Sequence, residues 1–91
     1  MLILTGRLIC ADAEQAERVR AHLPDHIRLT RAETGCISFE VTPSHDPLIW
    51  LVEERFASRA AFEAHQARLT TSDWGRATVG IRRDYQIDED E

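Results

Sequence analysis

The most informative stretch of the sequence is residues 36–56, which read CISFEVTPSHDPLIWLVEERF. Apolar and polar residues alternate on both sides of a turn, residues 43–47, that has a proline at each end. Alternation with a period of two is typical of half-buried strands, and proline favours the turns between them. Two strands joined by so short a turn predict an antiparallel hairpin, with strands at 36–42 and 48–56.

Each strand of this hairpin is expected to have one apolar face. In strict alternation, the members of these faces are Ile37, Phe39, Val41, Trp50, Val52 and Phe56. Cys36 then lies on the opposite face of the first strand, and Leu51 lies on the opposite face of the second. Glu54 shares the apolar face with Phe56, and a buried carboxylate needs a hydrogen-bonding or charged partner.

A strand and a helix are predicted before the hairpin. Residues 1–10 alternate and predict a strand, and Asp12 followed by Gln15 is a capping-box pattern that begins a helix. Pro24 is expected to interrupt this helix, because proline removes a backbone donor and clashes with the preceding turn. A second helical piece is therefore predicted over residues 24–33.

The chain after the hairpin repeats the helix and strand. Ser58 is the expected cap of a helix that places Phe62, His65 and Leu69 on one face. A short turn with Trp74 follows, and alternation over residues 79–87 predicts the last strand.

The order β-α-β-β-α-β predicts a ferredoxin-like α+β fold, with four antiparallel strands and the helices on one face of the sheet. Depending on the strand register, isoleucine, leucine and tryptophan side chains from three strands are expected on the other face, which soluble proteins rarely leave in water. A second copy of the chain would cover that face in a homodimer. The predicted domain covers residues 1–87, and the acidic residues 88–91 are expected to form a disordered tail.

The composition excludes several classes of function. The 91 residues amount to one small domain with a net charge of −5 and no lysine. The arginines are scattered, whereas nucleic-acid binding needs a basic stripe, so no nucleic-acid partner is predicted. No apolar run approaches the ~20 residues of a membrane span, and residues 1–10 have no basic n-region. We therefore expect a cytoplasmic protein with no membrane partner.

Cysteines and histidines give no pattern of a disulfide or a metal site. Cys10 and Cys36 fall on strands that the predicted sheet separates by a third strand, too far apart for a disulfide. His22 and His26 have the spacing of a metal pair, but Pro24 is expected to break the helix that would align them. Free thiols and no metal are predicted.

Four short motifs occur in order along the chain. Residues 34–39 read TGCISF, residues 46–47 read DP, residues 54–58 read ERFAS and residues 61–65 read AFEAH. This ordered set resembles the antibiotic biosynthesis monooxygenase domain family. Phe56 stands where that family usually has tryptophan, a change that keeps an aromatic wall.

The resemblance implies a dimeric α+β barrel that oxidises small electron-rich aromatics, such as quinols and polyketide anthrones, with O2 and without metal, flavin or other cofactor. The chemistry needs a base, an apolar pocket and exclusion of water, because a deprotonated hydroquinone can pass an electron to O2. The haem-degrading branch of the family relies on an asparagine in the first strand, and this chain has no asparagine.

His65 is the expected catalytic base, because an imidazole titrates near neutral pH and this one faces the sheet. The alternative is a buried histidine paired with a carboxylate and without a chemical role. Glu54 is the second expected catalytic residue, which would orient His65; a structural salt bridge is its alternative.

Six further residues are expected to bind the substrate. Arg83 and Tyr85 would offer a guanidinium and a hydroxyl to a phenolate, and the aromatic residues would wall the pocket. The full set is Trp50, Phe56, Phe62, Trp74, Arg83 and Tyr85. Ordinary positions in the core or at an interface are the alternative for each.

Two other functions stay open from the sequence. The same fold supports a non-catalytic ligand-binding or regulatory dimer, because fold alone does not determine function. An isomerase or decarboxylase could also use His65 for proton transfer without O2.

Overall fold

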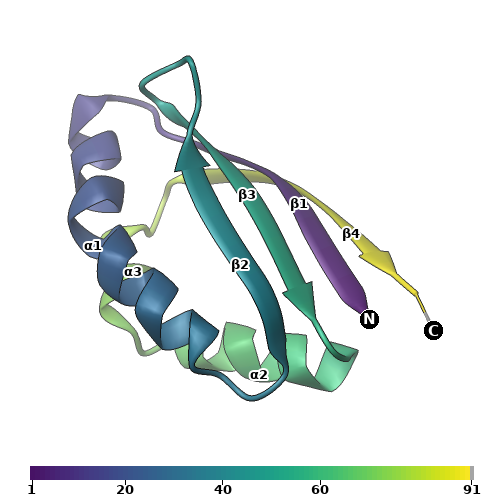
Figure 1. The fold of residues 1–91 in the computed structure, drawn as a ribbon. Helices are drawn as coiled ribbons and strands as arrows, with labels where there is room; N and C mark the ends of the chain where they lie inside the picture. The colour runs from purple at the N-terminus through teal and green to yellow at the C-terminus, as the bar shows by residue number, and fades with distance from the viewer. Residues whose placement is uncertain (91) are drawn as a thin grey trace.

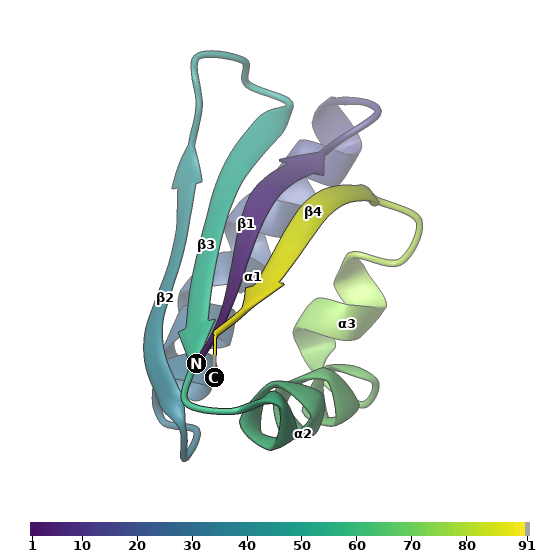
Figure 2. The same cartoon turned by 90° about the vertical axis from the view of Figure 1, so that its right-hand side faces the viewer.

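The computed structural model describes residues 1–90, which form one four-stranded antiparallel sheet with all helices on one side (Figures 1 and 2). The strand order is β2-β3-β1-β4, so the predicted ferredoxin-like α+β fold is confirmed. In chain order, the elements are β1 (Leu2–Ile9), α1 (Ala13–Arg31), β2 (Cys36–Pro43), β3 (Ile49–Phe56), α2 (Arg59–Leu69), α3 (Asp73–Ala77) and β4 (Arg82–Glu89).

The two long helices begin where the sequence predicts them. Asp12 accepts a hydrogen bond from the backbone N–H of Gln15 at 2.9 Å, and Ser58 accepts one from Ala61 at 3.1 Å. Each cap satisfies a backbone donor that the first helical turn leaves free. These caps fix the start of each helix directly after a strand.

The predicted break at Pro24 is wrong. α1 is continuous through Pro24, so residues 24–33 do not form a separate helical piece. Pro24 lies on the exposed face of the helix, where water can bond the carbonyl that loses its partner. On the buried face, Val19 and Leu23 keep the helix packed against the sheet on either side of the proline.

The expected alternation at the start of β2 is also wrong. Cys36 pairs with Phe56 of β3 and Ser38 pairs with Arg55, so Ile37 is an extra residue in a β-bulge. Because the bulge reverses the faces at this point, Cys36 packs against the core and Ile37 is 56% exposed.

The last strand begins later and ends later than predicted. β4 starts at Arg82, and Val79 precedes it in an exposed turn. Pairing with β1 continues to Glu89, which lies opposite Leu2. The strand follows Gly80, whose φ of +85° suits a turn rather than a strand.

The prediction of disorder is wrong for the first part of the acidic segment, residues 88–90. Glu89 belongs to β4 and accepts a hydrogen bond from Arg59 Nε at 2.7 Å. The backbone N–H of Asp90 donates to the carbonyl of Met1 at 2.8 Å. Backbone pairing with β1 does not depend on side-chain charge, so the acidic residues extend the strand. Glu91 lies outside the described residues.

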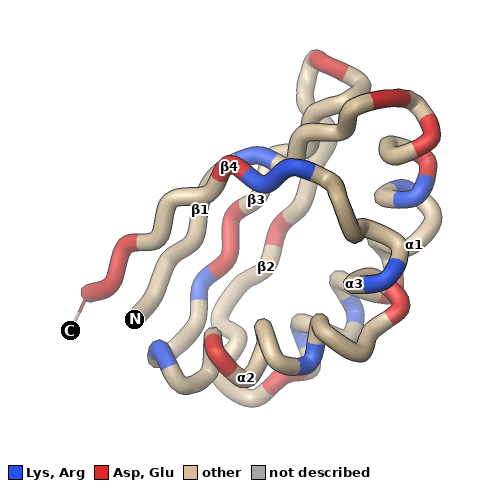
Figure 3. Tube along the Cα trace, turned by 180° about the vertical axis from the view of Figure 1, so that it is seen from behind, with Lys and Arg blue, Asp and Glu red and all other residues tan. Residues whose placement is uncertain are grey.

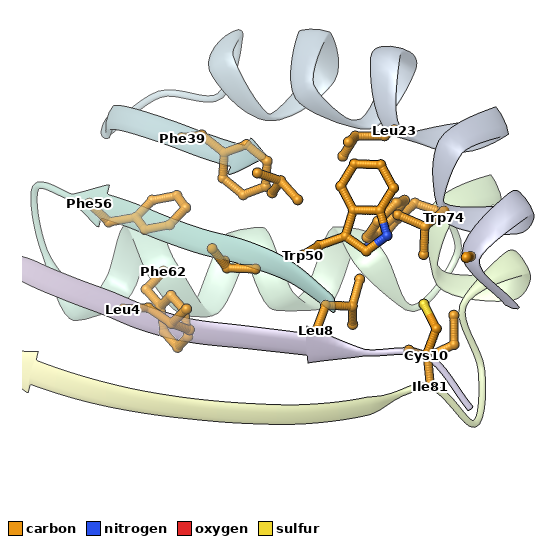
Figure 4. Close-up of a cluster of buried hydrophobic side chains, with 14 of the residues drawn as sticks. Leu4, Leu8, Cys10, Leu23, Phe39, Trp50, Phe56, Phe62, Trp74 and Ile81 are labelled. Atoms are coloured by element: carbon orange, nitrogen blue, oxygen red, sulfur yellow. The ribbon is translucent and has the colours of Figure 1, made fainter. Parts of the chain in front are cut away.

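The hydrophobic core lies between the sheet and the helices (Figure 4). Phe56 and Phe62 pack edge to face at one end of the cluster, with ring centroids 5.7 Å apart. Trp50 and Trp74 lie at the other end, near Leu23 of α1. Trp50 therefore faces the helices, as its alternation with Val52 and Phe56 predicts, and not the outer face that another strand register would give it.

The outer face of the sheet is mixed in character. Ile9, Ile49 and Leu51 form an apolar group at one end of this face, where Ile9 pairs with Ile49, and Leu51 is 46% exposed. Ile3 lies near the other end, opposite Arg55. Charged residues are dispersed over the molecule, without a basic stripe on one element (Figure 3). No helix among the described residues is long and apolar enough to span a membrane.

Candidate active site

A cavity of about 160 Å³ lies between the sheet and the helices. All four strands and all three helices contribute to its wall, which is mainly apolar. The residues that line it are Leu4, Leu8, His26, Phe39, Val41, Val52, Glu54, His65, Gln66, Leu69, Trp74, Arg83 and Tyr85.

His65 is held in place by the carboxylate of Glu33. His65 is 2% exposed, and its Nδ1 lies 2.8 Å and 3.1 Å from the two carboxylate oxygens. Arg68 Nε donates to the same carboxylate at 2.5 Å, which supports an ionised Glu33. Since a carboxylate only accepts, Nδ1 carries the proton and Nε2 has the free lone pair.

The free lone pair of His65 faces a second carboxylate. Nε2 of His65 lies 3.8 Å from Oε1 of Glu54, too far for a direct hydrogen bond. Oε1 of Glu54 has no hydrogen-bond partner among the described residues, and Glu54 is 6% exposed. An imidazole thus lies between two carboxylates, one of which is bonded to it and one of which is not.

The pKa values of Glu54 and His65 both differ from their usual values. Burial and the nearby charge of Glu33 raise the pKa of Glu54 to about 7, against the opposing charge of Arg83. Burial lowers the pKa of His65, and the adjacent Glu33 carboxylate partly opposes this. Near neutral pH, the cavity therefore holds a neutral imidazole and a carboxyl group close to its midpoint, which suits proton transfer.

A second histidine lies in the cavity wall, on α1. His26 is 4% exposed, and its ring stacks on Trp74 with centroids 4.3 Å apart and planes 2° apart. Burial, together with the neighbouring His65, Arg68 and Arg83, lowers its pKa to about 3. His26 is therefore uncharged at any pH near neutrality.

The two polar residues of β4 have different surroundings. Arg83 donates to the carbonyls of Thr78 and Ile81 at 3.0 and 2.9 Å and to Thr78 Oγ1 at 2.8 Å. Its guanidinium thus holds the turn before β4. Burial raises the pKa of Tyr85 to about 12, with a contribution from Glu54, so its phenol stays protonated and can donate.

The structure brings most of the predicted site residues together. His65, Glu54, Trp74, Arg83 and Tyr85 line the cavity. The other three, Trp50, Phe56 and Phe62, lie in the core and not in the cavity wall. Among these three, Phe56 contacts the site indirectly, with its ring centroid 5.0 Å from that of His65.

Two residues of the site, Glu33 and His26, are not predicted by the sequence. Glu33 lies in the turn after α1, 32 positions before His65, and no local pattern links the two. The sequence suggests only a metal-ligand spacing for His26, and a helix that breaks at Pro24 does not predict that His26 points inward. A continuous 3.6-residue period through Leu23, which is buried, would have placed His26 inside.

Both cysteines are free, in agreement with the predicted sheet order. Burial raises the pKa of both thiols, with contributions from Asp12 at Cys10 and from Glu33 at Cys36. Neither thiol lines the cavity. Among residues 1–90, no group of three or more His, Cys, Asp or Glu side chains is placed to hold a metal ion.

Comparison with known proteins identifies one family. The family model for antibiotic biosynthesis monooxygenases matches residues 1–76. No curated protein sequence matches the chain.

Solved structures share the fold over nearly the whole chain. One is a Nitrosomonas europaea protein that is named as an antibiotic biosynthesis monooxygenase. It has a TM-score of 0.85 at 16% sequence identity, and the match covers 99% of this chain and 98% of that protein's chain. A similarly named Deinococcus radiodurans protein has a TM-score of 0.77 at 23% identity, covering 100% and 93%. A Pseudomonas aeruginosa protein has a TM-score of 0.72 at 26% identity, covering 96% and 88%.

Proposed function

Because the chain belongs to the antibiotic biosynthesis monooxygenase family, we propose that it is a cofactor-independent monooxygenase that oxidises a small electron-rich aromatic with O2. The observation that carries the proposal is the buried His65, bonded to Glu33 on one side and facing Glu54 and an apolar cavity on the other. A buried base beside a mainly apolar cavity suits the deprotonation of a phenol.

His65 acts as the base in the first step. Its Nε2 accepts the proton of a substrate hydroxyl, and the imidazolium that forms keeps its Nδ1–H bond to Glu33. The negative charge of Glu33 stabilises this imidazolium, as the carboxylate does in other acid–histidine pairs. Glu33 is therefore a positioning residue that fixes the tautomer and orientation of His65.

Glu54 stabilises the anion that results. In its protonated form, the carboxyl group can donate a hydrogen bond to the phenolate oxygen. Burial favours this neutral form, because a carboxylate beside Glu33 would meet both desolvation and repulsion. The phenol of Tyr85 offers a second donor in the same wall.

Oxygen then reacts with the electron-rich ring. The phenolate transfers one electron to O2, and the resulting radical and superoxide combine to form a peroxide anion on a ring carbon. The imidazolium of His65 returns its proton to this anion and gives the hydroperoxide. Loss of water leaves one oxygen atom on the ring, so a hydroquinone and O2 give a hydroxyquinone and water. The apolar wall, which includes Leu4, Val52 and Leu69, excludes water from these intermediates.

The proposed enzyme works as a homodimer in the cytoplasm. The apolar side chains of the outer sheet face, Ile3 at one end and Ile9, Ile49 and Leu51 at the other, would be covered by a second copy. Light scattering of the wild type should give twice the monomer mass of 10.4 kDa, and Leu51→Arg should give the monomer with an unchanged far-ultraviolet spectrum. A wild type that stays monomeric at micromolar concentrations would contradict this part of the proposal.

Oxygen uptake tests the proposed activity. Protein freed of metal and flavin should accelerate O2 consumption by a hydroquinone, and His65→Ala should slow it by about 10²–10⁴-fold, the usual contribution of a positioned base. His45→Ala is the matched control, because His45 is exposed in the hairpin turn and should leave the rate unchanged.

Three results would contradict the proposal, and each would favour a different alternative. Turnover that persists in His65→Ala would move the base to Glu54 or Tyr85. Turnover without oxygen uptake would indicate the isomerase or decarboxylase alternative. Tight binding of an aromatic without any turnover would indicate a ligand-binding dimer.

A further inference from the structure

Two unpaired polar atoms belong to the wall of the proposed active site. Within residues 1–90, three buried side-chain atoms have no hydrogen-bond partner: His26 Nδ1, Trp50 Nε1 and Glu54 Oε1. His26 and Glu54 line the cavity, whereas Trp50 does not. Because folded proteins pair most buried polar atoms, these two atoms mark positions where a bound molecule would complete the hydrogen bonding.

Aromatic contacts hold the His26 ring rigidly. Its face stacks on Trp74, and Phe39 meets it edge to face with centroids 5.1 Å apart. The ring lies 6.0 Å from the ring of His65, centroid to centroid. The two imidazoles are thus close neighbours, but only His65 has a carboxylate partner.

His26 can bind a hydroxyl group but cannot act as its base. Its surroundings include His65, Arg68 and Arg83, and no carboxylate bonds to it. A neutral imidazole has one donor and one acceptor, so it can pair with a hydroxyl in either direction. This distinguishes His26 from His65, which can take up a proton with the support of Glu33.

The volume of the cavity limits the ligand to a single ring. The cavity measures about 160 Å³, close to the ~150 Å³ of an apolar protein cavity that binds benzene. Sites for larger ligands usually measure roughly 300–1,000 Å³. Apart from the polar residues discussed, the wall is formed mainly by Leu4, Leu8, Phe39, Val41, Val52 and Leu69.

We propose that His26 is the specificity-determining residue of the site, which binds the second hydroxyl of a single-ring substrate while the first lies at Glu54 and His65. Glu54 belongs to β3 in the sheet and His26 to α1 in the helical layer, so the two contacts come from opposite walls. Hydroxyls at opposite ends of one ring, as in hydroquinone, fit this arrangement. The inference rests on the proposed function for the location of the site.

Binding without oxygen tests the inference separately from turnover. Calorimetry under anaerobic conditions would compare hydroquinone, phenol and 1,4-dihydroxynaphthalene. The wild type should bind hydroquinone about tenfold or more tightly than phenol, which lacks the second hydroxyl, and should bind the two-ring diol most weakly.

Two variants test whether the preference for hydroquinone over phenol depends on the His26 side chain. His26→Phe keeps an aromatic ring against Trp74, so it should bind phenol as the wild type does and lose the preference for hydroquinone. His22→Phe is the matched control, because His22 lies one turn earlier on α1 and does not line the cavity. It should keep the wild-type preference.

Several results would overturn the inference. They are equal binding of phenol and hydroquinone by the wild type, a preference that survives in His26→Phe, or binding of the two-ring diol as tight as that of hydroquinone. The wild-type comparison alone decides the matter if His26→Phe fails to fold. A preference for hydroquinone without oxygen uptake would leave this inference intact and contradict only the proposed monooxygenase activity.

Discussion

Glu53 and Glu54 are neighbours on β3, yet they belong to different chemical environments. Glu53 lies on the outer face of the sheet, is exposed and lies 3.5 Å from Arg55. Glu54 lies on the helix-facing side, buried, with one oxygen unpaired and a pKa raised to about 7. Strand alternation alone produces this difference, because successive side chains point to opposite faces.

The same contrast holds for the two faces as a whole. On the outer face, Arg7 and Asp84 form an ion pair at 2.6 Å in which both side chains are about half exposed. Between the sheet and the helices, Nε2 of His65 on α2 lies 3.8 Å from Oε1 of Glu54 on β3, and both side chains are almost fully buried. Exposed pairs are screened by water and contribute little to stability, whereas burial shifts pKa values into the range useful for catalysis.

The largest expected effect on stability is that of Glu54→Gln, which removes the buried titrating group. The raised pKa means that the folded chain holds one more proton than the unfolded chain between about pH 4.5 and 7. Wild-type stability therefore falls relative to that of the variant as the pH rises through this window. The gain of Glu54→Gln over wild type should grow by on the order of 3 kcal/mol between pH 4 and pH 8.

Denaturant unfolding at several pH values measures this gain. The shifts of His26 and His65 act in the opposite direction on each protein, and comparing variant with wild type largely removes them. Glu53→Gln is the control and should show no such growth. A difference between Glu54→Gln and wild type that is constant with pH would mean that Glu54 titrates normally.

A smaller effect, on turnover, is expected from Glu33→Gln, which removes the charged carboxylate bonded to Nδ1 of His65. The turnover number should fall about tenfold, with little change in the KM, because the imidazolium loses its partner. The pKa of His65 should also fall, since Glu33 raises it, so the rise of rate with pH should move to lower pH. An unchanged pH profile would contradict a positioning role, and Glu40→Gln on the exposed side of β2 is the control.

The smallest effect on stability is expected from a substitution on the outer face of the sheet. Asp84→Asn breaks the exposed ion pair with Arg7, and the melting temperature should change by less than about 2 °C. Arg7 keeps the pKa of Asp84 below its usual value, but solvent screens this interaction. A shift of more than about 5 °C in calorimetry would mean that the two faces differ less than described.

Local patterns predict the sheet and the caps because they depend on neighbours in sequence. The hairpin, the cap at Ser58 and the inward direction of Glu54 and His65 follow from period and turn chemistry. Pro24 shows where such rules fail, since tertiary packing of the buried face keeps α1 continuous despite a local helix breaker. The bulge at Ile37 has no signal in the sequence, because it arises from pairing with β3.

The candidate site was only partly predictable for a related reason. Its two ends, His65 and Glu54, stand out as polar residues on apolar faces. Glu33 and His26 do not stand out, because their roles come from contacts across 32 and 39 positions of the chain.

The most direct test of the central claim uses oxygen labelled with ¹⁸O. The proposed reaction places one atom of O2 on the ring and releases the other as water. Mass spectrometry of the product formed from hydroquinone under ¹⁸O2 should therefore show a hydroxyquinone with one ¹⁸O atom, and His65→Ala should form it far more slowly. An unlabelled product formed at the wild-type rate would contradict the monooxygenase account of this site.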